Sequence, residues 1–132
     1  MLNLTGASLV LADTSIWVGH VRVGNTLLKD FLEEGVVLMH PCVRCELALG
    51  NMKSRTELLG FLTALPESEV ATEEEVLHLI EANRLWGMGI GWVDAHLLAA
   101  TKLTDRCALW TTDGSLRKAC EKSAVRLFSG AV

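Results

Sequence analysis

The stretch LVLADTSIWVGH (residues 9–20) carries an apolar run directly into an acidic residue. Residues 9–12 are all apolar, as in a strand that is buried on both faces, and Asp13 follows at once. A buried charge without a partner is costly, so the Asp13 carboxylate requires compensating groups or water. The stretch therefore predicts a first core strand that ends at a polar site.

Short apolar segments alternate with longer segments of helical periodicity along the rest of the chain. The predicted strands are residues 8–12, 36–39, 108–111 and 125–128, and the predicted helices are 25–34, 41–50, 54–65, 72–86, 92–103 and 115–123. Thr72 and Glu75 have the spacing of a capping box. The alternation predicts an α/β fold in three layers, with a central parallel sheet of four to five strands and helices on both faces. Ligands on such sheets bind beyond the carboxyl ends of strands, where Asp13 lies.

Length and composition indicate one folded domain, residues 1–132. No apolar run approaches the roughly 18 residues of a membrane span, and the N-terminus lacks the pattern of a signal peptide. We therefore expect a cytoplasmic protein. In that compartment Cys42, Cys45, Cys107 and Cys120 are expected to be free thiols.

The net charge of −4 has the wrong sign for a protein that holds nucleic acid by overall electrostatics. Any contact with nucleic acid must therefore come from a local site with basic residues around it.

Three other acidic residues share the apolar surroundings of Asp13. Asp113 follows the predicted strand 108–111, so it repeats the order of strand and then acid. Glu46 has Val43 and Leu49 on its own helix face, and Asp94 heads an apolar stripe on the predicted helix 92–103. Two acids thus end strands and two lie on helices that can pack near those ends.

Each acid also has a purely structural explanation. Asp13 and Asp113 suit helix N-caps, Asp94 suits a first helical turn, and Glu46 can point outward into solvent. Taken together, however, carboxylates in one pocket repel one another, and a bound cation relieves that repulsion. Oxygen ligands without His or Cys spacing favour Mg²⁺ or Mn²⁺. Such a metal activates water and binds phosphate oxygens, so the set suggests hydrolysis of phosphodiester bonds.

Four segments in order, LADTSIWVGHVR (11–22), HPCVRCELALGNMKSR (40–55), GIGWVDAHLLAATKL (89–103) and ALWTTDGSLRKAC (108–120), resemble the PIN domain. More narrowly, they resemble the VapC-type toxins of VapBC toxin–antitoxin pairs. The resemblance runs from about Leu9 to Phe128. It implies a PIN-like fold, a Mg²⁺- or Mn²⁺-dependent endoribonuclease, a cognate antitoxin as partner, and a homodimer.

The resemblance also implies roles for single residues. Asp13, Glu46, Asp94 and Asp113 match the four acids of the family in this order, with Asp13 and Asp94 expected to touch metal directly. Glu46 and Asp113 are expected to act through water or to complete a second metal site. The hydroxyls of Ser15 and Thr112 are expected to support the acids, by bonding a carboxylate, a water or a phosphate oxygen. One departure from the family pattern is Cys45, which stands where a small residue often precedes the second acid.

Basic residues are available to bind RNA near the acids, and a solvated surface is the alternative for each of them. Arg22, Arg117 and Lys118 are the main candidates, and the other basic residues considered are Arg44, Lys122 and Arg126. Trp86 and Trp92, on either side of the glycine-rich connector 87–91, are candidates for a dimer or antitoxin contact.

Other interpretations remain open. The chain could be a PIN nuclease of RNA processing without a toxin role, a non-catalytic regulatory module, or a phosphotransfer receiver, although no Lys follows the last strand as a receiver requires. The CxxC at residues 42–45 is weak as a zinc or redox motif because Cys107 and Cys120 are poorly spaced to complete it. The histidines share no spacing and are expected to be structural or exposed.

Overall fold

The computed structural model describes residues 6–130, so the first five and last two residues of the predicted domain lie outside it. Its sheet has the strand order β2-β1-β3-β4, and all neighbouring strands are parallel. The strands are β1 (Leu9–Ala12), β2 (Val37–Leu38), β3 (Cys107–Trp110) and β4 (Leu127–Phe128). The predicted α/β class with a parallel sheet is confirmed, with four strands in the described residues.

Seven helices accompany the sheet in residues 6–130. They are α1 (Thr14–Val23), α2 (Thr26–Glu33), α3 (Pro41–Ala48), α4 (Arg55–Ala64), α5 (Glu73–Asn83), α6 (Trp92–Leu103) and α7 (Gly114–Lys122). The capping box that Thr72 and Glu75 predict is present at the start of α5. None of these helices is long and apolar enough to cross a membrane.

Helix α1 is not among the helices predicted from the sequence. Its β-branched residues lower helix propensity, which is why the segment gave no helical prediction. The helix forms because Asp13 caps its first turn and because Ile16 and Trp17 are buried in the core. Tertiary packing thus overrides local preference here.

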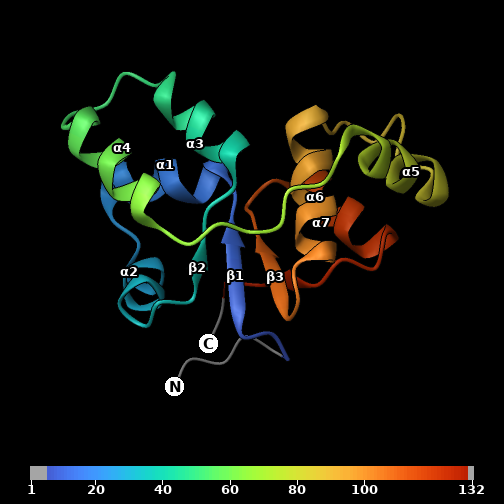
Figure 1. Cartoon of the computed structure of the whole chain (residues 1–132), viewed down its shortest axis with the longest axis horizontal. Coiled ribbons are helices and arrows are strands. Elements are labelled where there is room, and N and C mark those ends of the chain that lie inside the picture. The colour runs from blue at the N-terminus through green and yellow to red at the C-terminus, as the bar shows by residue number, and fades with distance from the viewer. Residues whose placement is uncertain (1–5, 131–132) are drawn as a thin grey trace.

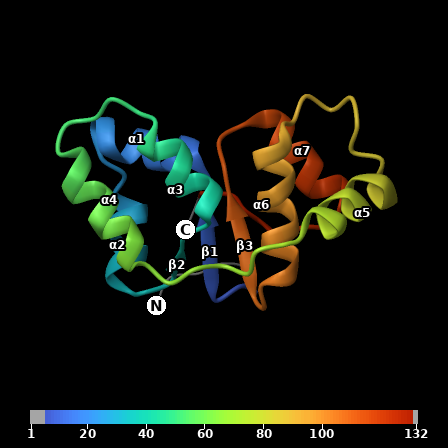
Figure 2. The ribbon, with the colours of Figure 1, turned by 45° about the horizontal axis from the view of Figure 1, so that its top comes forward.

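The helices divide into two groups around β1. In both views α1 to α4 gather on the β2 side of the molecule and α5 to α7 on the β3 side (Figures 1 and 2). Strands β1 and β3 are almost wholly buried between them, and the apolar stripe expected on α6 is buried as well. The core is therefore continuous across the sheet.

The register of the strands aligns their carboxyl ends. Ala12 of β1 pairs with Trp110 of β3, and Leu11 pairs with Leu38 of β2. The chain leaves β1 for β2 on one side and later returns to β3 on the other, so the order reverses at β1. Asp13 follows β1 at this switch point, which is where parallel sheets bind ligands.

Candidate active site

Asp13 is a buried carboxylate held by neutral donors. It is 5% exposed and caps α1. Its Oδ1 accepts bonds from Ser15 Oγ at 2.5 Å and from the Ile16 amide at 3.2 Å, and its Oδ2 accepts a bond from Thr111 Oγ1. No basic side chain pairs with it, because the one ion pair in residues 6–130 joins Arg44 to Glu67. The three donors satisfy the carboxylate without neutralising its charge.

The two predicted supporting hydroxyls have different partners. Ser15 contacts Asp13 directly, whereas Thr112 Oγ1 donates to Ser15 Oγ at 3.1 Å. The second hydroxyl that reaches Asp13 belongs to Thr111, the residue directly after β3, which was not among the predicted site residues. The pairing of Ala12 with Trp110 explains this, because it sets Thr111 level with Asp13.

Asp113 caps α7 at the end of the same loop. Its Oδ1 accepts bonds from the amides of Ser115 at 2.8 Å and Leu116 at 3.1 Å. Its own amide donates to Thr111 Oγ1 at 3.0 Å. Thr111 therefore connects Asp13 to the loop that carries Asp113. The side chain of Asp113 is otherwise exposed.

Glu46 lies on α3 and is exposed, so the structural alternative of an outward side chain applies to it. Thr14 Oγ1 of α1 donates to Glu46 Oε1 at 2.5 Å, which holds the carboxylate over the start of α1, next to Asp13. The expected apolar face is half correct: Val43 is buried, but Leu49 is 89% exposed. Leu49 is exposed because the helix ends before it, at Ala48.

The charges of the other three acids act on Asp94. It is partly buried in the first turn of α6, where its Oδ2 accepts a 3.3 Å bond from the Gly91 amide. Burial raises the pKa of Asp94, and the charges of Asp113, Asp13 and Glu46 raise it further, against the opposing effect of the Gly91 bond. Residues more than 80 positions apart in the chain thus share one electrostatic environment.

The four carboxylates share this environment without closing into a compact cluster. Within residues 6–130 no group of three or more His, Cys, Asp or Glu side chains is close enough to form a metal site by itself. The electrostatic coupling acts over longer distances than metal ligation does, so the two observations are compatible.

Two of the main basic candidates lie beside the acids. Arg117 Nη1 donates to the carbonyl of Thr111 at 3.3 Å and lines a cavity of about 500 Å³ together with Thr112. Arg22 lines a cavity of about 310 Å³ together with Glu46. Lys118 is exposed on α7, in the turn after Asp113.

The other basic residues are engaged elsewhere. Arg44 pairs with Glu67 at 2.9 Å, and Lys122 donates to the carbonyl of Arg84. Arg126 precedes β4 and lines a cavity at the amino ends of the strands, so its expected place near the acids is wrong.

The cysteines are free thiols, as expected. Burial raises the pKa values of Cys107 and Cys120 to about 12, and burial also raises that of Cys42. These shifts favour the unreactive thiol form. Trp86 and Trp92 are 60% and 46% exposed, so both are free to contact a partner.

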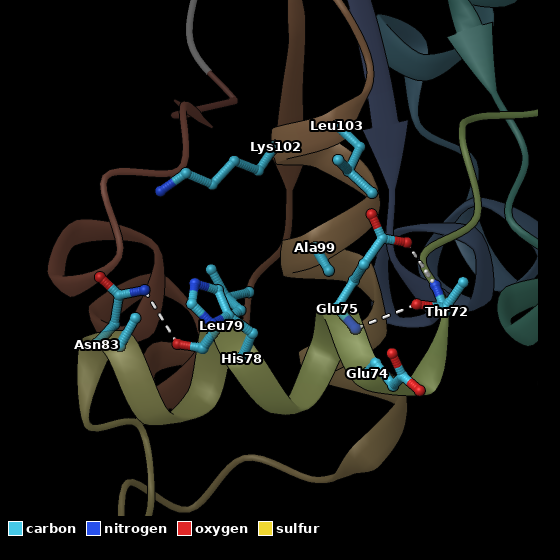
Figure 3. Close-up of a pocket in the computed structure, with 10 residues that line it drawn as sticks. Thr72, Glu74, Glu75, His78, Leu79, Asn83, Ala99, Lys102 and Leu103 are labelled. Carbon is cyan, nitrogen blue, oxygen red and sulfur yellow. Dashed lines mark hydrogen bonds between the residues drawn. The ribbon is translucent and has the colours of Figure 1, made fainter.

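A groove between α5 and α6 is the main competing cavity. It has a volume of about 570 Å³ and is lined by Leu79, Ala99, Lys102 and other residues of the two helices (Figure 3). None of the four acids lines it. Its Glu75 belongs to the capping box, and its Lys102 donates to the carbonyl of Ser123. The groove offers no cluster of reactive groups, so the strand ends remain the better candidate.

A scan against models of known protein families finds no match for the chain. Among known proteins it is similar to two relatives named Ribonuclease VapC32, from the CDC 1551 / Oshkosh and ATCC 25618 / H37Rv strains of Mycobacterium tuberculosis. Each is 42% identical over 119 residues, which cover 90% of this chain and 96% of the relative. The chain therefore belongs to the family of VapC-type PIN-domain toxins.

Proposed function

We propose that this protein is a divalent-metal-dependent endoribonuclease that hydrolyses phosphodiester bonds in single-stranded or loop regions of RNA. The observation that carries the proposal is the electrostatic coupling of Asp94 to Asp13, Glu46 and Asp113, which come from different elements. Like charges that lie close together repel one another and so lower the stability of the fold. A group of acids of this kind beside the strand ends therefore indicates a functional site. The ribonuclease name of the two relatives supports the same chemistry.

The donor set fits Mg²⁺ or Mn²⁺. All four proposed ligands are carboxylates, and no basic side chain among residues 6–130 pairs with any of them. Asp13 and Asp94 would hold the cation directly, and Glu46 and Asp113 through water. Because the carboxylates are too widely spaced to ligate a metal alone, water and RNA phosphate oxygens would complete the set. When bound, the cation lowers the pKa of water and offsets charge on the phosphate.

The protein's own residues prepare this chemistry. Ser15 and Thr111 fix the orientation of Asp13, and Thr14 fixes that of Glu46. Arg22, Arg117 and Lys118 would contact backbone phosphates on either side of the cut. Ser15 donates to Asp13, which is a proposed metal ligand, and no His or Lys among residues 6–130 pairs with the Ser15 hydroxyl to activate it, so water would be the attacking group.

The decisive variant is Asp94→Asn, with Asp105→Asn as its matched control. Asp105 is exposed just before β3, at the opposite edge of the sheet. With Mn²⁺ and a single-stranded RNA, Asp94→Asn should lose about a thousandfold or more in cleavage rate. Asp105→Asn should cut at the wild-type rate, and chelation should stop the wild type. Wild-type cleavage by Asp94→Asn would remove that acid from the mechanism.

We further propose that the protein is the toxin of a type II toxin–antitoxin pair, acts as a homodimer in the cytoplasm, and is neutralised by a peptide segment that places a basic residue among the acids. Brief expression should arrest growth, and sequencing of RNA ends should reveal cuts that Asp13→Asn lacks. Co-expression with the product of an adjacent reading frame should restore growth. RNA cleavage without growth arrest would instead indicate a processing nuclease.

A further inference from the structure

Two histidine rings lie close together beside the acids, and each has one buried nitrogen without a hydrogen-bond partner among residues 6–130. The centroids of His40 and His96 are 5.9 Å apart, and His40 is 1% exposed. Within residues 6–130 neither His40 Nε2 nor His96 Nδ1 has a hydrogen-bond partner, although both atoms are buried. Buried polar atoms are nearly always paired, so two unpaired nitrogens on neighbouring rings require an explanation.

The capping bond of His40 fixes where its proton lies. His40 Nδ1 accepts a 3.0 Å bond from the Cys42 amide, so Nδ1 carries no hydrogen. A neutral ring with a bare Nδ1 has its hydrogen on Nε2. His40 therefore presents a donor, and the unpaired nitrogen of His96 is the available acceptor.

The two rings stand on the elements that carry two of the acids. Because Leu11 pairs with Leu38, His40 lies level with Asp13 in the register of β2 and β1, and it caps α3, the helix of Glu46. His96 lies on α6, two residues after Asp94, and α3 packs against α6. The ring of Trp92 meets His96 edge-on at 4.9 Å and limits its movement.

We propose that His40 and His96 form a hydrogen-bonded positioning pair, with His40 Nε2–H donating to His96 Nδ1 directly or across one water. The pair sets the separation of α3 from α6, and therefore of Glu46 from Asp94. Two imidazoles joined nitrogen to nitrogen would have centroids roughly 5 Å apart, so the 5.9 Å separation needs only a small ring movement or a single water. The role in catalysis rests on the function proposed above; the bond itself does not.

The first test is the tautomer of each ring, measured by ¹⁵N NMR on the full chain at neutral pH. His40 should carry its hydrogen on Nε2, and Nδ1 of His96 should be bare. A hydrogen on Nδ1 of His96 would leave that atom unable to accept the bond and would overturn the pair.

The second test separates the pair from the capping bond. His40→Asn keeps a side-chain acceptor for the α3 amide but cannot reach His96, because Asn caps helices well and is shorter. His96→Leu removes the acceptor, and His96→Asn keeps an oxygen near the position of Nδ1. His78→Leu, in the distant α5–α6 groove, is the matched control.

His40→Asn and His96→Leu should each lower kcat for RNA about tenfold with KM unchanged, because they shift the acids and leave RNA contacts in place. The double variant should be no worse than either single one, and His96→Asn should stay within about threefold of wild type. Additive losses, a change in KM alone, or equal losses in His96→Asn and His96→Leu would overturn the positioning role.

Mn²⁺ affinity, measured by calorimetry without RNA, distinguishes failure of this inference from failure of the proposed ribonuclease. His40→Asn should weaken Mn²⁺ binding several-fold, and His78→Leu should leave it unchanged. If the wild type bound Mn²⁺ but cut no RNA, the ribonuclease proposal would fail, and this affinity comparison together with the tautomers would still decide the pair. Unchanged affinity in His40→Asn would overturn the inference.

Discussion

At the scale of single residues, the notable feature is how Asp13 is stabilised. Ser15, Thr111 and the Ile16 amide donate to its carboxylate, and no basic side chain of residues 6–130 pairs with it. Hydrogen bonds from neutral groups make burial tolerable but leave the net charge in place. A salt bridge would have cancelled that charge. The arrangement therefore suits a carboxylate whose charge is used for binding.

Thr111→Val tests this arrangement. The variant keeps the shape of the side chain and removes the hydroxyl that donates to buried Asp13, so it should lower the free energy of unfolding by about 1.5–3 kcal/mol. Urea denaturation measures the change. Thr112→Val is the matched control, because its exposed hydroxyl donates to Ser15 and to no other group in residues 6–130; it should cost less than about 0.5 kcal/mol. Equal effects of the two variants would contradict the assigned bond.

The raised pKa of Asp94 predicts a pH-dependent stability. Because the folded state holds this proton more tightly than the unfolded state, stability is lost as the pH rises from the unfolded pKa through the raised folded one. Asp94→Asn has no carboxyl group to ionise at this position, so its stability does not fall in this way as the pH rises. In metal-free buffer it should therefore be more stable than the wild type at pH 7, with the difference vanishing below about pH 4. A difference that did not change with pH would contradict the shift.

At the scale of elements, strand ends and helix starts create the site. Asp13 and Asp113 both cap helices that follow strands, so the structural explanation considered for each from the sequence is correct. A capping role uses one carboxylate oxygen of Asp113, and no amide in the described part of the chain donates to the other. Capping and metal binding are thus compatible in one residue.

Asp113→Asn separates these two roles, with Asp113→Ala for comparison. Asn caps as well as Asp does, so Asp113→Asn should keep the stability of the wild type, whereas Asp113→Ala should lose about 1 kcal/mol. Both variants remove the charge, and RNA cleavage should fall equally in the two. Thermal unfolding and a cleavage assay give the two readouts. If Asp113→Asn kept both the stability and the cleavage rate of the wild type while Asp113→Ala lost both, capping would be the only role of Asp113.

The sequence predicted the elements that hydrophobic periodicity marks clearly and missed those fixed by tertiary contacts. The four strands and six of the helices followed from apolar patterns and caps. Helix α1 could not be predicted in this way, because its β-branched residues have low helix propensity. The burial of Ile16 and Trp17 in the core stabilises it instead. The role of Thr111 required the strand register, and the meeting of His40 with His96 required the packing of α3 on α6. Long-range pairing of this kind leaves no signal in one sequence.

At the scale of the whole molecule, the fold brings acids together from distant parts of a chain of net charge −4. Their common edge is the switch point between β1 and its two neighbours, as the predicted parallel sheet implied. The positions of the strand-end acids were thus predictable from topology. The spacing between the carboxylates was not, because it depends on side-chain orientation at four helix and loop positions.

Mn²⁺ should stabilise the entire fold through this site. A ligand at one hundred times its dissociation constant adds about 2.7 kcal/mol to the free energy of unfolding, so the wild-type Tm should rise with Mn²⁺ concentration. The Tm of Asp94→Asn should rise much less, while that of Asp105→Asn should follow the wild type. An equal rise in all three proteins would place the bound metal elsewhere.

The most direct test of the account is a crystal structure of the wild type grown with Mn²⁺, with anomalous scattering used to locate the ion. We predict an anomalous peak in contact with carboxylate oxygens of Asp13 and Asp94, with Glu46 and Asp113 facing it through water. A peak at another part of the molecule, with these side chains turned apart into solvent at millimolar Mn²⁺, would contradict the claim that the four acids form one site.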